Sequence, residues 1–422
     1  MKKNKTAVIG IDGVPYELMD DLSEKGIMPN FQDLKRGGIF KKMRSSIPEI
    51  SSVAWSSIIT GKNPAEHGIF GLTEIIPNTY TLAFPDFSWL KTPAFWQKNS
   101  GKKYVILNVP STYPVKKLNG VHISGFISPD LEKAVYPQEY LPYLNEINYQ
   151  TDVDSSTAHK SKGLFLENLA EVNEARIKAY KYFWAKENWD VFMLVFTGSD
   201  RLEHFLFDAY EEENNPYRQG FLEYFKSIDR VIGEIASQIG EEDNLLILSD
   251  HGMERIKTNF YVNSLLEKTG FLALDRSLRG YNQISPETKA FALDPGRIYL
   301  HKKGKYQRGT VEKKDEEKII SEIIRLFEGA EYNGERVIKK VCRKGEIYKG
   351  KEFDRAPDLV LIKNPGYRLR ANIGKNMLFE KDVFTGDHAL DNAFFLLRDK
   401  SREKIVPQNL TVENIVSILN NL

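Results

Sequence analysis

Short apolar runs that lead into an acidic residue constrain this chain more than any other feature. Three such runs, at residues 6–11, 191–196 and 245–248, are followed by Asp12, Asp200 and Asp250. Unbroken apolar runs without alternation are typical of strands that are buried on both faces, as in a parallel sheet. Because ligands bind outside the carboxyl ends of strands in an open α/β sheet, we expect the three aspartates to meet at one site.

Helical patterns separate these runs. Apolar residues recur at helical spacing over 163–187 and 217–239, as on the buried stripe of an amphipathic helix. The alternation of strand and helix predicts βαβ units, and therefore an α/β fold with a mostly parallel central sheet. Further strands are expected over 104–109, 121–126, 297–301 and 358–362.

Residues 256–354 differ from the rest of the chain. They contain more charged residues, glycine and turn signals, and only short apolar runs. We interpret them as an inserted cap or lobe within one catalytic domain that covers residues 1–422.

Composition narrows the class of protein and its partners. The chain has 59 Lys+Arg and 58 Asp+Glu, so we expect no nucleic-acid partner held by a basic face. The single cysteine, Cys342, cannot form an internal disulfide, which favours a reducing compartment. No stretch approaches the ~20 apolar residues of a membrane span. We therefore expect a soluble cytoplasmic protein, and the sequence leaves its oligomeric state open.

Histidines accompany two of the three acids. His251 follows Asp250 directly, and His204 lies four residues after Asp200, on the same face if a helix begins there. A third histidine, His388, lies in the segment TGDHALDN, which we interpret as a turn. Carboxylate and imidazole together are good ligands for zinc, and for manganese or iron with less preference. One Asp–His pair often only caps a helix, but three at the ends of predicted elements indicate a metal site.

A serine-rich segment forms the last candidate feature. Residues 47–61 predict a turn that opens a helix ending at Thr60-Gly61. A hydroxyl at a helix N-terminus lies near backbone N–H groups that suit a phosphoryl anion. The alternative is a plain serine N-cap.

Taken in chain order, these segments resemble the alkaline phosphatase superfamily, and most closely its type I phosphodiesterase/nucleotide pyrophosphatase family. The segments are Asp12-Gly13, PEISSVAWSSIITGKNPAEHGI, Asp200 to His204, Asp250-His251-Gly252 and Gly386-Asp387-His388. The resemblance spans nearly the whole chain, and it implies an α/β/α sandwich with a mostly parallel central sheet and an inserted cap region.

The resemblance also implies a two-zinc site, with Mn²⁺ or another divalent metal as an alternative. One metal would be held by Asp200, His204 and His388. The other would be held by Asp12, Asp250, His251 and the oxygen of the nucleophile. The family nucleophile lies ten residues before the glycine of the Thr-Gly pair, which gives Ser51, with Ser52 as the alternative.

The activity implied is metal-dependent hydrolysis of phosphodiester or pyrophosphate bonds in a small phosphate ester or nucleotide-like substrate, through a phospho-Ser intermediate. Metal ions can activate a hydroxyl and neutralise the leaving oxygen. No Arg or Lys occurs between Arg44 and Lys62, and Ala54 offers no donor, so we expect diesters to be preferred over monoesters. The alternatives are a phosphomonoesterase, a phosphotransferase of the phosphoglycerate mutase kind, or a non-catalytic binding protein that kept the fold.

Overall fold

The computed structural model describes residues 4–422, which divide into two compact units. Among the described residues, the first unit comprises residues 4–62, 86–255 and 383–422, and the second comprises residues 63–85 and 256–382. The predicted cap over 256–354 therefore lies within the second unit. That the whole chain forms one catalytic domain with an inserted cap stays a prediction.

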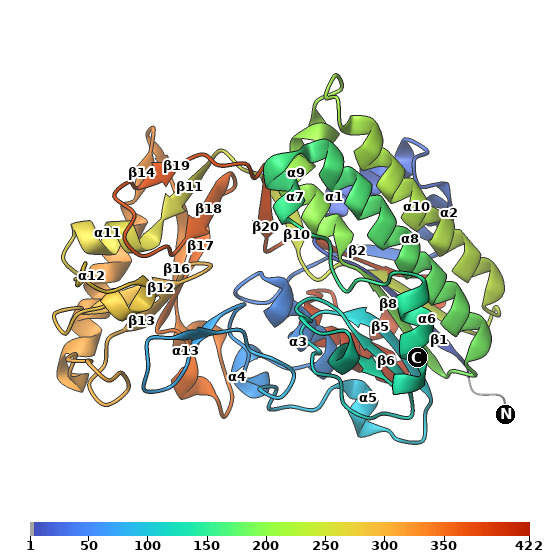
Figure 1. Ribbon diagram of the computed structural model, residues 1–422, viewed down its shortest axis with the longest axis horizontal. Coiled ribbons are helices and arrows are strands. Elements are labelled where there is room, and N and C mark those ends of the chain that lie inside the picture. Colours follow the sequence, from blue (N-terminus) through green and yellow to red (C-terminus); the bar gives the residue numbers. More distant parts are fainter. Residues whose placement is uncertain (1–3) are drawn as a thin grey trace. The chain divides into compact units, whose positions relative to one another are not determined.

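A mostly parallel sheet forms the centre of the first unit (Figure 1). The sheet has eight strands. Five central strands run parallel in the order β9-β1-β8-β5-β6. At one edge β21 is antiparallel to β9 and β2 is antiparallel to β21, and at the other edge β7 is antiparallel to β6. The strands are β1 (Thr6–Ile11), β2 (Ile39–Met43), β5 (Tyr104–Val109), β6 (Gly120–Ser124), β7 (Val135–Tyr136), β8 (Val191–Phe196), β9 (Asn244–Leu248) and β21 (Ala393–Leu397).

Helices cover both faces of this sheet. Successive residues of β1 point to opposite faces, so Ala7 and Ile9 belong to one hydrophobic core and Val8 to another. The first core packs under α1 (Tyr16–Glu24), α2 (Pro29–Gly37), α6 (Leu141–Glu146), α7 (Ser156–Lys160), α8 (Lys162–Lys186), α9 (Gly198–Glu211) and α10 (Arg218–Gln238). The second packs under α3 (Ser51–Thr60), α5 (Phe95–Lys98) and α14 (Ile415–Asn421). The predicted α/β/α architecture with a mostly parallel sheet is confirmed.

The strand register places the acidic segments at one edge. In the parallel pairs on either side of β1, Ile11 is the partner of Phe196, and Gly10 is the partner of Leu248. The chain therefore leaves β1, β8 and β9 at the same edge of the sheet, as the apolar runs predicted.

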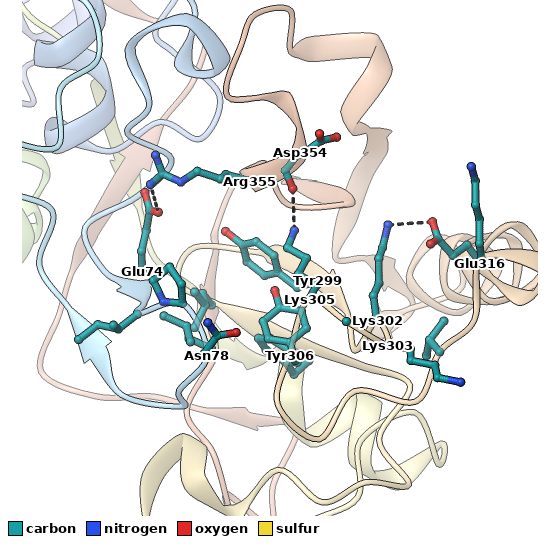
Figure 2. Close-up of a pocket in the computed structure, with 18 of the residues that line it drawn as sticks. Glu74, Asn78, Tyr299, Lys302, Lys303, Lys305, Tyr306, Glu316, Asp354 and Arg355 are labelled. Carbon is teal, nitrogen blue, oxygen red and sulfur yellow. Dashed lines mark hydrogen bonds and ion pairs between the residues drawn. The ribbon is translucent and has the colours of Figure 1, made fainter.

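The second unit has its own sheets and core. A four-stranded antiparallel sheet has the order β12-β13-β17-β16, and a three-stranded sheet has the order β18-β11-β19. The elements of the unit are α4 (Pro64–His67), β3 (Glu74–Ile75), β4 (Leu82–Ala83), β11 (Thr258–Tyr261), α11 (Val262–Lys268), β12 (Ala290–Leu293), β13 (Arg297–Leu300), α12 (Glu316–Glu328), β14 (Glu331–Tyr332), β15 (Glu335–Arg336), β16 (Ile338–Arg343), α13 (Lys344–Ile347), β17 (Leu359–Lys363), β18 (Tyr367–Arg370) and β19 (Phe379–Glu380). A cavity lies within this unit (Figure 2).

None of the helices among residues 4–422 combines the length and the apolar composition needed to cross a membrane.

Candidate active site

Three aspartates meet where the parallel strands end. Asp12 follows β1 directly, Asp250 lies two residues after β9, and Asp200 lies in the first turn of α9, just after β8. Each is at most 2% exposed. Gly13 has a φ of +78°, and a Cβ added there would lie 3.0 Å from the Cβ of Asp200. Only glycine fits this turn comfortably, because it tolerates the left-handed conformation and needs no side-chain space.

The first turns of α9 present Asp200 and His204 on one face, as the four-residue spacing predicted. His204 Nε2 lies 3.4 Å from Asp200 Oδ1. His204 Nδ1 donates to the carbonyl oxygen of Gly386 at 2.8 Å. Because that bond fixes the proton on Nδ1, the Nε2 lone pair faces the site.

His388 joins these residues from the far end of the chain. It lies on β20 (Gly386–Ala389), which pairs antiparallel with β10 (Gly252–Arg255), so the predicted turn at this histidine is wrong. The strand forms because its backbone groups find partners on β10. In that pairing Met253 is opposite His388, and His388 Nε2 lies 2.9 Å from His204 Nε2 and 3.3 Å from Asp200 Oδ1.

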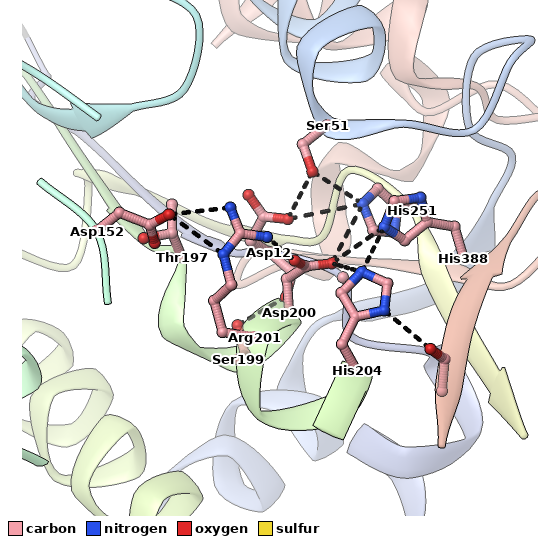
Figure 3. Close-up of polar contacts among 12 residues, drawn as sticks. Asp12, Ser51, Asp152, Thr197, Ser199, Asp200, Arg201, His204, His251 and His388 are labelled. Carbon is pink, nitrogen blue, oxygen red and sulfur yellow. Dashed lines mark hydrogen bonds and ion pairs between the residues drawn. The ribbon is translucent and has the colours of Figure 1, made fainter. Parts of the chain in front are cut away.

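His251 lies between the other ligands. Its Nδ1 donates to the Gly252 carbonyl oxygen at 3.0 Å, which directs Nε2 towards the acids. That Nε2 atom is 3.4 Å from Asp250 Oδ2, 3.6 Å from Asp12 Oδ1 and 3.8 Å from Asp200 Oδ1. Figure 3 shows the carboxylates of Asp12 and Asp200 beside the imidazoles of His204, His251 and His388.

Ser51 is the first residue of α3, which ends at Thr60 before Gly61, as predicted. Its Oγ donates to Asp12 Oδ1 at 3.2 Å and lies 3.1 Å from His251 Nε2 (Figure 3). Ser52 Oγ, in contrast, is buried and makes no hydrogen bond to any residue within 4–422. Of the two serines, Ser51 is therefore the one whose hydroxyl contacts the acid–histidine cluster.

Three further residues, whose roles the sequence did not reveal, support the ligands. Trp55 is fully buried and its indole N–H donates to Asp12 Oδ2 at 2.9 Å. Trp55 lies one helical turn after Ser51 on α3, and this spacing could have indicated from the sequence that its side chain lies near the site. Arg201 donates to Asp200 Oδ2 at 2.6 Å and, through Nε and Nη2, to Asp152 Oδ2 at 3.2 and 3.0 Å. Asp152 lies in an irregular segment with no sequence pattern that links it to Arg201.

The acids influence one another strongly. Burial, together with the charges of Asp250 and Asp200, raises the pKa of Asp12 well above its usual value. Burial is also the main reason why the pKa of Asp250 rises to about 7. Burial opposes ionisation of Asp200 as well, but His204, His388 and Arg201 outweigh it and hold the pKa of that carboxyl well below its usual range. Buried acids this close together favour a bound cation.

The donor set fits a divalent metal. Three ligand atoms of Asp12, Asp250 and His251 lie within 4.8 Å of one another, and so do those of Asp200, His251 and His388. Asp200 Oδ1 and Asp250 Oδ2 are buried and accept no hydrogen bond from the described residues, 4–422. Since a buried carboxylate oxygen is costly to leave without a partner, these oxygens are suited to bind a cation. The structure thus brings together all seven residues named from the sequence.

Carboxylates and imidazoles gathered beside a helix-terminal hydroxyl, at the carboxyl edge of a mostly parallel sheet, are the arrangement of the alkaline phosphatase superfamily. Within this superfamily the chain belongs to the type I phosphodiesterase / nucleotide pyrophosphatase family, whose model matches residues 6–391. The enzymes of this family are metal-dependent phosphoric ester hydrolases, and the chain is an enzyme of this type. The resemblance noted in the sequence is confirmed.

Solved structures share the fold at low sequence identity. Phosphonoacetate hydrolase from Sinorhizobium meliloti 1021, in complex with phosphonoformate, has a TM-score of 0.68 at 17% identity, covering 99% of this chain and 95% of that chain. An inactive form of murine ectonucleotide pyrophosphatase / phosphodiesterase 5, in complex with AMP, has a TM-score of 0.57 at 15% identity, covering 99% and 94%. The human counterpart has a TM-score of 0.56 at 14% identity, covering 99% and 94%. No curated protein matches the chain.

Proposed function

We propose that this enzyme hydrolyses phosphodiester or pyrophosphate bonds at a two-zinc site, with Ser51 as the nucleophile. The observation that carries the proposal is the position of the Ser51 hydroxyl. It lies at the N-terminus of α3 and within 3.2 Å of both Asp12 Oδ1 and His251 Nε2. The unpaired N–H groups of a helix N-terminus favour an anion, such as a phosphoryl group, at the same place.

The ligand atoms divide into two groups. The inner group, Asp12, Asp250 and His251, would hold one zinc together with Ser51 Oγ. The outer group, Asp200, His204 and His388, would hold the other. His251 Nε2 borders both groups, since it lies 3.8 Å from Asp200 Oδ1. Zinc at these positions would supply positive charge that favours the deprotonated Ser51 oxygen and neutralises oxygens of the phosphoryl group.

Ser51 would then carry the covalent chemistry. Its oxygen forms a bond to phosphorus while the bond from phosphorus to the leaving oxygen breaks, giving a phosphoserine. In a second step water attacks this phosphorus, the bond from phosphorus to Ser51 Oγ breaks, and a proton from the water restores the Ser51 hydroxyl as the phosphate product leaves. The hydrogen bond from Trp55 to Asp12 Oδ2 keeps the other carboxylate oxygen of Asp12 towards Ser51.

The environment of Arg201 supports a preference for diesters. A monoester carries a dianionic phosphoryl group, and an additional cation would stabilise it. Arg201 stands next to a ligand in the sequence, but its donors are directed to the carboxylates of Asp200 and Asp152. A singly charged diester needs no such cation.

The solved relatives bind small phosphorus-containing anions, which supports a small substrate. The phosphonoacetate hydrolase structure contains phosphonoformate, and the murine phosphodiesterase structure contains AMP. In the latter, the inactive form carries alanine in place of a threonine. In that protein the replacement of one hydroxyl side chain accompanies the loss of activity, as we expect for the replacement of Ser51 in this enzyme.

The neighbouring serine provides a matched control. We expect Ser51→Ala to lower kcat/KM for bis(4-nitrophenyl) phosphate by about 10³-fold or more, as for loss of a nucleophile. Ser52→Ala removes a hydroxyl that has no hydrogen-bond partner in residues 4–422, so we expect its activity to stay within about threefold of the parent enzyme. An active Ser51→Ala beside an inactive Ser52→Ala would assign the nucleophile to Ser52 instead.

A further inference from the structure

The second unit contains a cavity that the proposed function does not use. Its volume is about 860 Å³, within the range of small-molecule sites. The lining residues come from the 74–78 segment, from β12 and β13, from residues 302–316 and from residues 354–355, all of which belong to this unit.

Aromatic rings form one wall of the cavity. Phe291 and Tyr299 are stacked, with ring centroids 5.8 Å apart and an interplanar angle of 17°. Tyr306 packs edge-on against Phe291 at 5.2 Å and 81°. Ile75 and Ile76 add aliphatic surface to the lining. Phe291 is 0% exposed and supports the two tyrosine rings from behind, so Tyr299 and Tyr306 are the rings that a flat ligand can contact.

Most of the charged side chains around the cavity are paired with an opposite charge. Arg355 contacts Glu74 at 2.8 Å, and Lys302 contacts Glu316 and Asp358, each at 2.8 Å. Lys303 is largely exposed and lies 3.7 Å from a carboxylate oxygen of Glu312. These pairs leave little net charge for a ligand to neutralise.

Lys305, in contrast to these paired side chains, forms its hydrogen bond with the backbone and not with a carboxylate. Its Nζ donates to the backbone carbonyl oxygen of Asp354 at 2.8 Å and lies 5.8 and 5.9 Å from the ring centroids of Tyr299 and Tyr306 (Figure 2). Within the described part of the chain no carboxylate oxygen lies within 4.0 Å of this ammonium group. Burial lowers the pKa of Lys305, although the charge of Asp358 acts in the opposite direction. An ammonium group with no carboxylate in direct contact, set beside aromatic rings, is suited to bind an anionic group.

We propose that this cavity binds a small aromatic anion, with its ring against Tyr299 and Tyr306 and its anionic group on the Lys305 ammonium. The inference is independent of the proposed function, because every residue that it uses lies in the second unit.

A fluorescent aromatic anion tests the site directly. In the zinc-loaded full chain, 8-anilinonaphthalene-1-sulfonate is the probe, and N-phenyl-1-naphthylamine is the matched neutral compound. We expect Lys305→Met to weaken binding of the sulfonate by about tenfold or more, since a hydrogen bond to a charged group is lost. Binding of the neutral compound should change by less than about twofold, because the side-chain volume is kept. Lys305→Arg keeps the charge and should bind the sulfonate within about threefold of the parent.

Lys303→Met is the charge control, because Lys303 lies two residues away and faces Glu312 and solvent. We expect it to change sulfonate binding by less than about twofold, as for an exposed ion pair. Equal losses for Lys303→Met and Lys305→Met would overturn the proposal, and so would unchanged binding in Lys305→Met.

A second pair of variants tests the wall without changing Lys305. Ile76 lines the cavity and is 37% exposed, whereas Phe84 is 57% exposed and is not among the lining residues. Ile76→Asp places a negative charge at the wall and should weaken sulfonate binding by about tenfold or more, and Phe84→Asp by less than about twofold. Equal effects of the two substitutions would place the bound probe outside this cavity and contradict the proposal.

Discussion

The inner and outer ligand groups proposed for the active site are built in different ways. In the inner group, the side chains of Asp12, Asp250 and His251 are at most 3% exposed. They follow buried parallel strands, and the backbone N–H of Gly13 holds Asp250 at 3.1 Å. The sheet core itself therefore fixes the inner group.

The outer group depends on longer-range contacts. His204 and His388 are 9% and 16% exposed in their side chains, and His388 arrives on a strand 184 residues further along the chain. Its acid, Asp200, is held by an ion pair with Arg201, which Asp152 holds in turn. The outer zinc of the proposed site should therefore be the more easily lost of the two, and the following variants test this difference.

The largest effect is expected for His251→Ala, because His251 Nε2 borders both groups. The substitution should reduce the zinc content below one per chain and lower kcat/KM by about 10³-fold or more. Elemental analysis after gel filtration measures the zinc content. A variant that keeps two tightly bound zinc ions would contradict the assignment of this ligand.

His388→Ala should remove only the outer zinc. We expect the zinc content to fall from two to one, with the inner ion retained, and kcat/KM to fall by about 10²-fold or more because one of two catalytic metals is lost. The same elemental analysis, carried out beside His251→Ala, compares the two groups. If His388→Ala lost both ions, the two groups would not be separable in the way described.

A smaller effect is expected for Asp152→Asn, which leaves all the ligands in place. The substitution weakens the ion pair that positions Arg201, and Arg201 in turn positions Asp200. The outer zinc should therefore bind about 10- to 100-fold more weakly, as for other residues that orient metal ligands. Competition with a chromogenic chelator measures both zinc affinities. Weakening of the inner ion to the same degree would count against the role of Asp152 at the outer group.

The smallest effect is expected for Trp55→Phe. The phenyl ring keeps much of the packing but removes the N–H that donates to Asp12 Oδ2. We expect a loss of about 1 kcal/mol in the free energy of unfolding, the typical net value of one hydrogen bond, and a less than tenfold decrease in kcat/KM. Denaturant titration and steady-state kinetics measure the two quantities. A loss of activity as large as that of His251→Ala would show that Trp55 does more than orient Asp12.

The difference between local and long-range contacts also explains how much of the site could be predicted from the sequence. Asp12, Asp200 and Asp250 were identifiable because each follows an apolar run, and parallel strands share one carboxyl edge. His204 followed from its helical spacing to Asp200. These signals are local, so the sequence contains them directly.

The remaining features depend on contacts between distant segments. His388 reaches the site because β20 pairs with β10, and the local sequence around it suggested a turn. Asp152 reaches Arg201 across 49 positions without a periodic pattern. In the second unit, residues 63–85 associate with 256–382, which no change in composition indicated. The grouping of the ligands into two metal sites came from the resemblance to the family.

The most direct test of the two-zinc account is the dependence of activity on the number of bound metal ions. The enzyme is stripped with a chelator, zinc is restored stepwise, and kcat/KM for bis(4-nitrophenyl) phosphate is measured at each zinc content. The proposed two-zinc site predicts little activity up to one zinc per chain and full activity at two, because the inner group fills first and both ions are needed. Full activity at one zinc per chain, or activity that survives complete removal of metal, would contradict it.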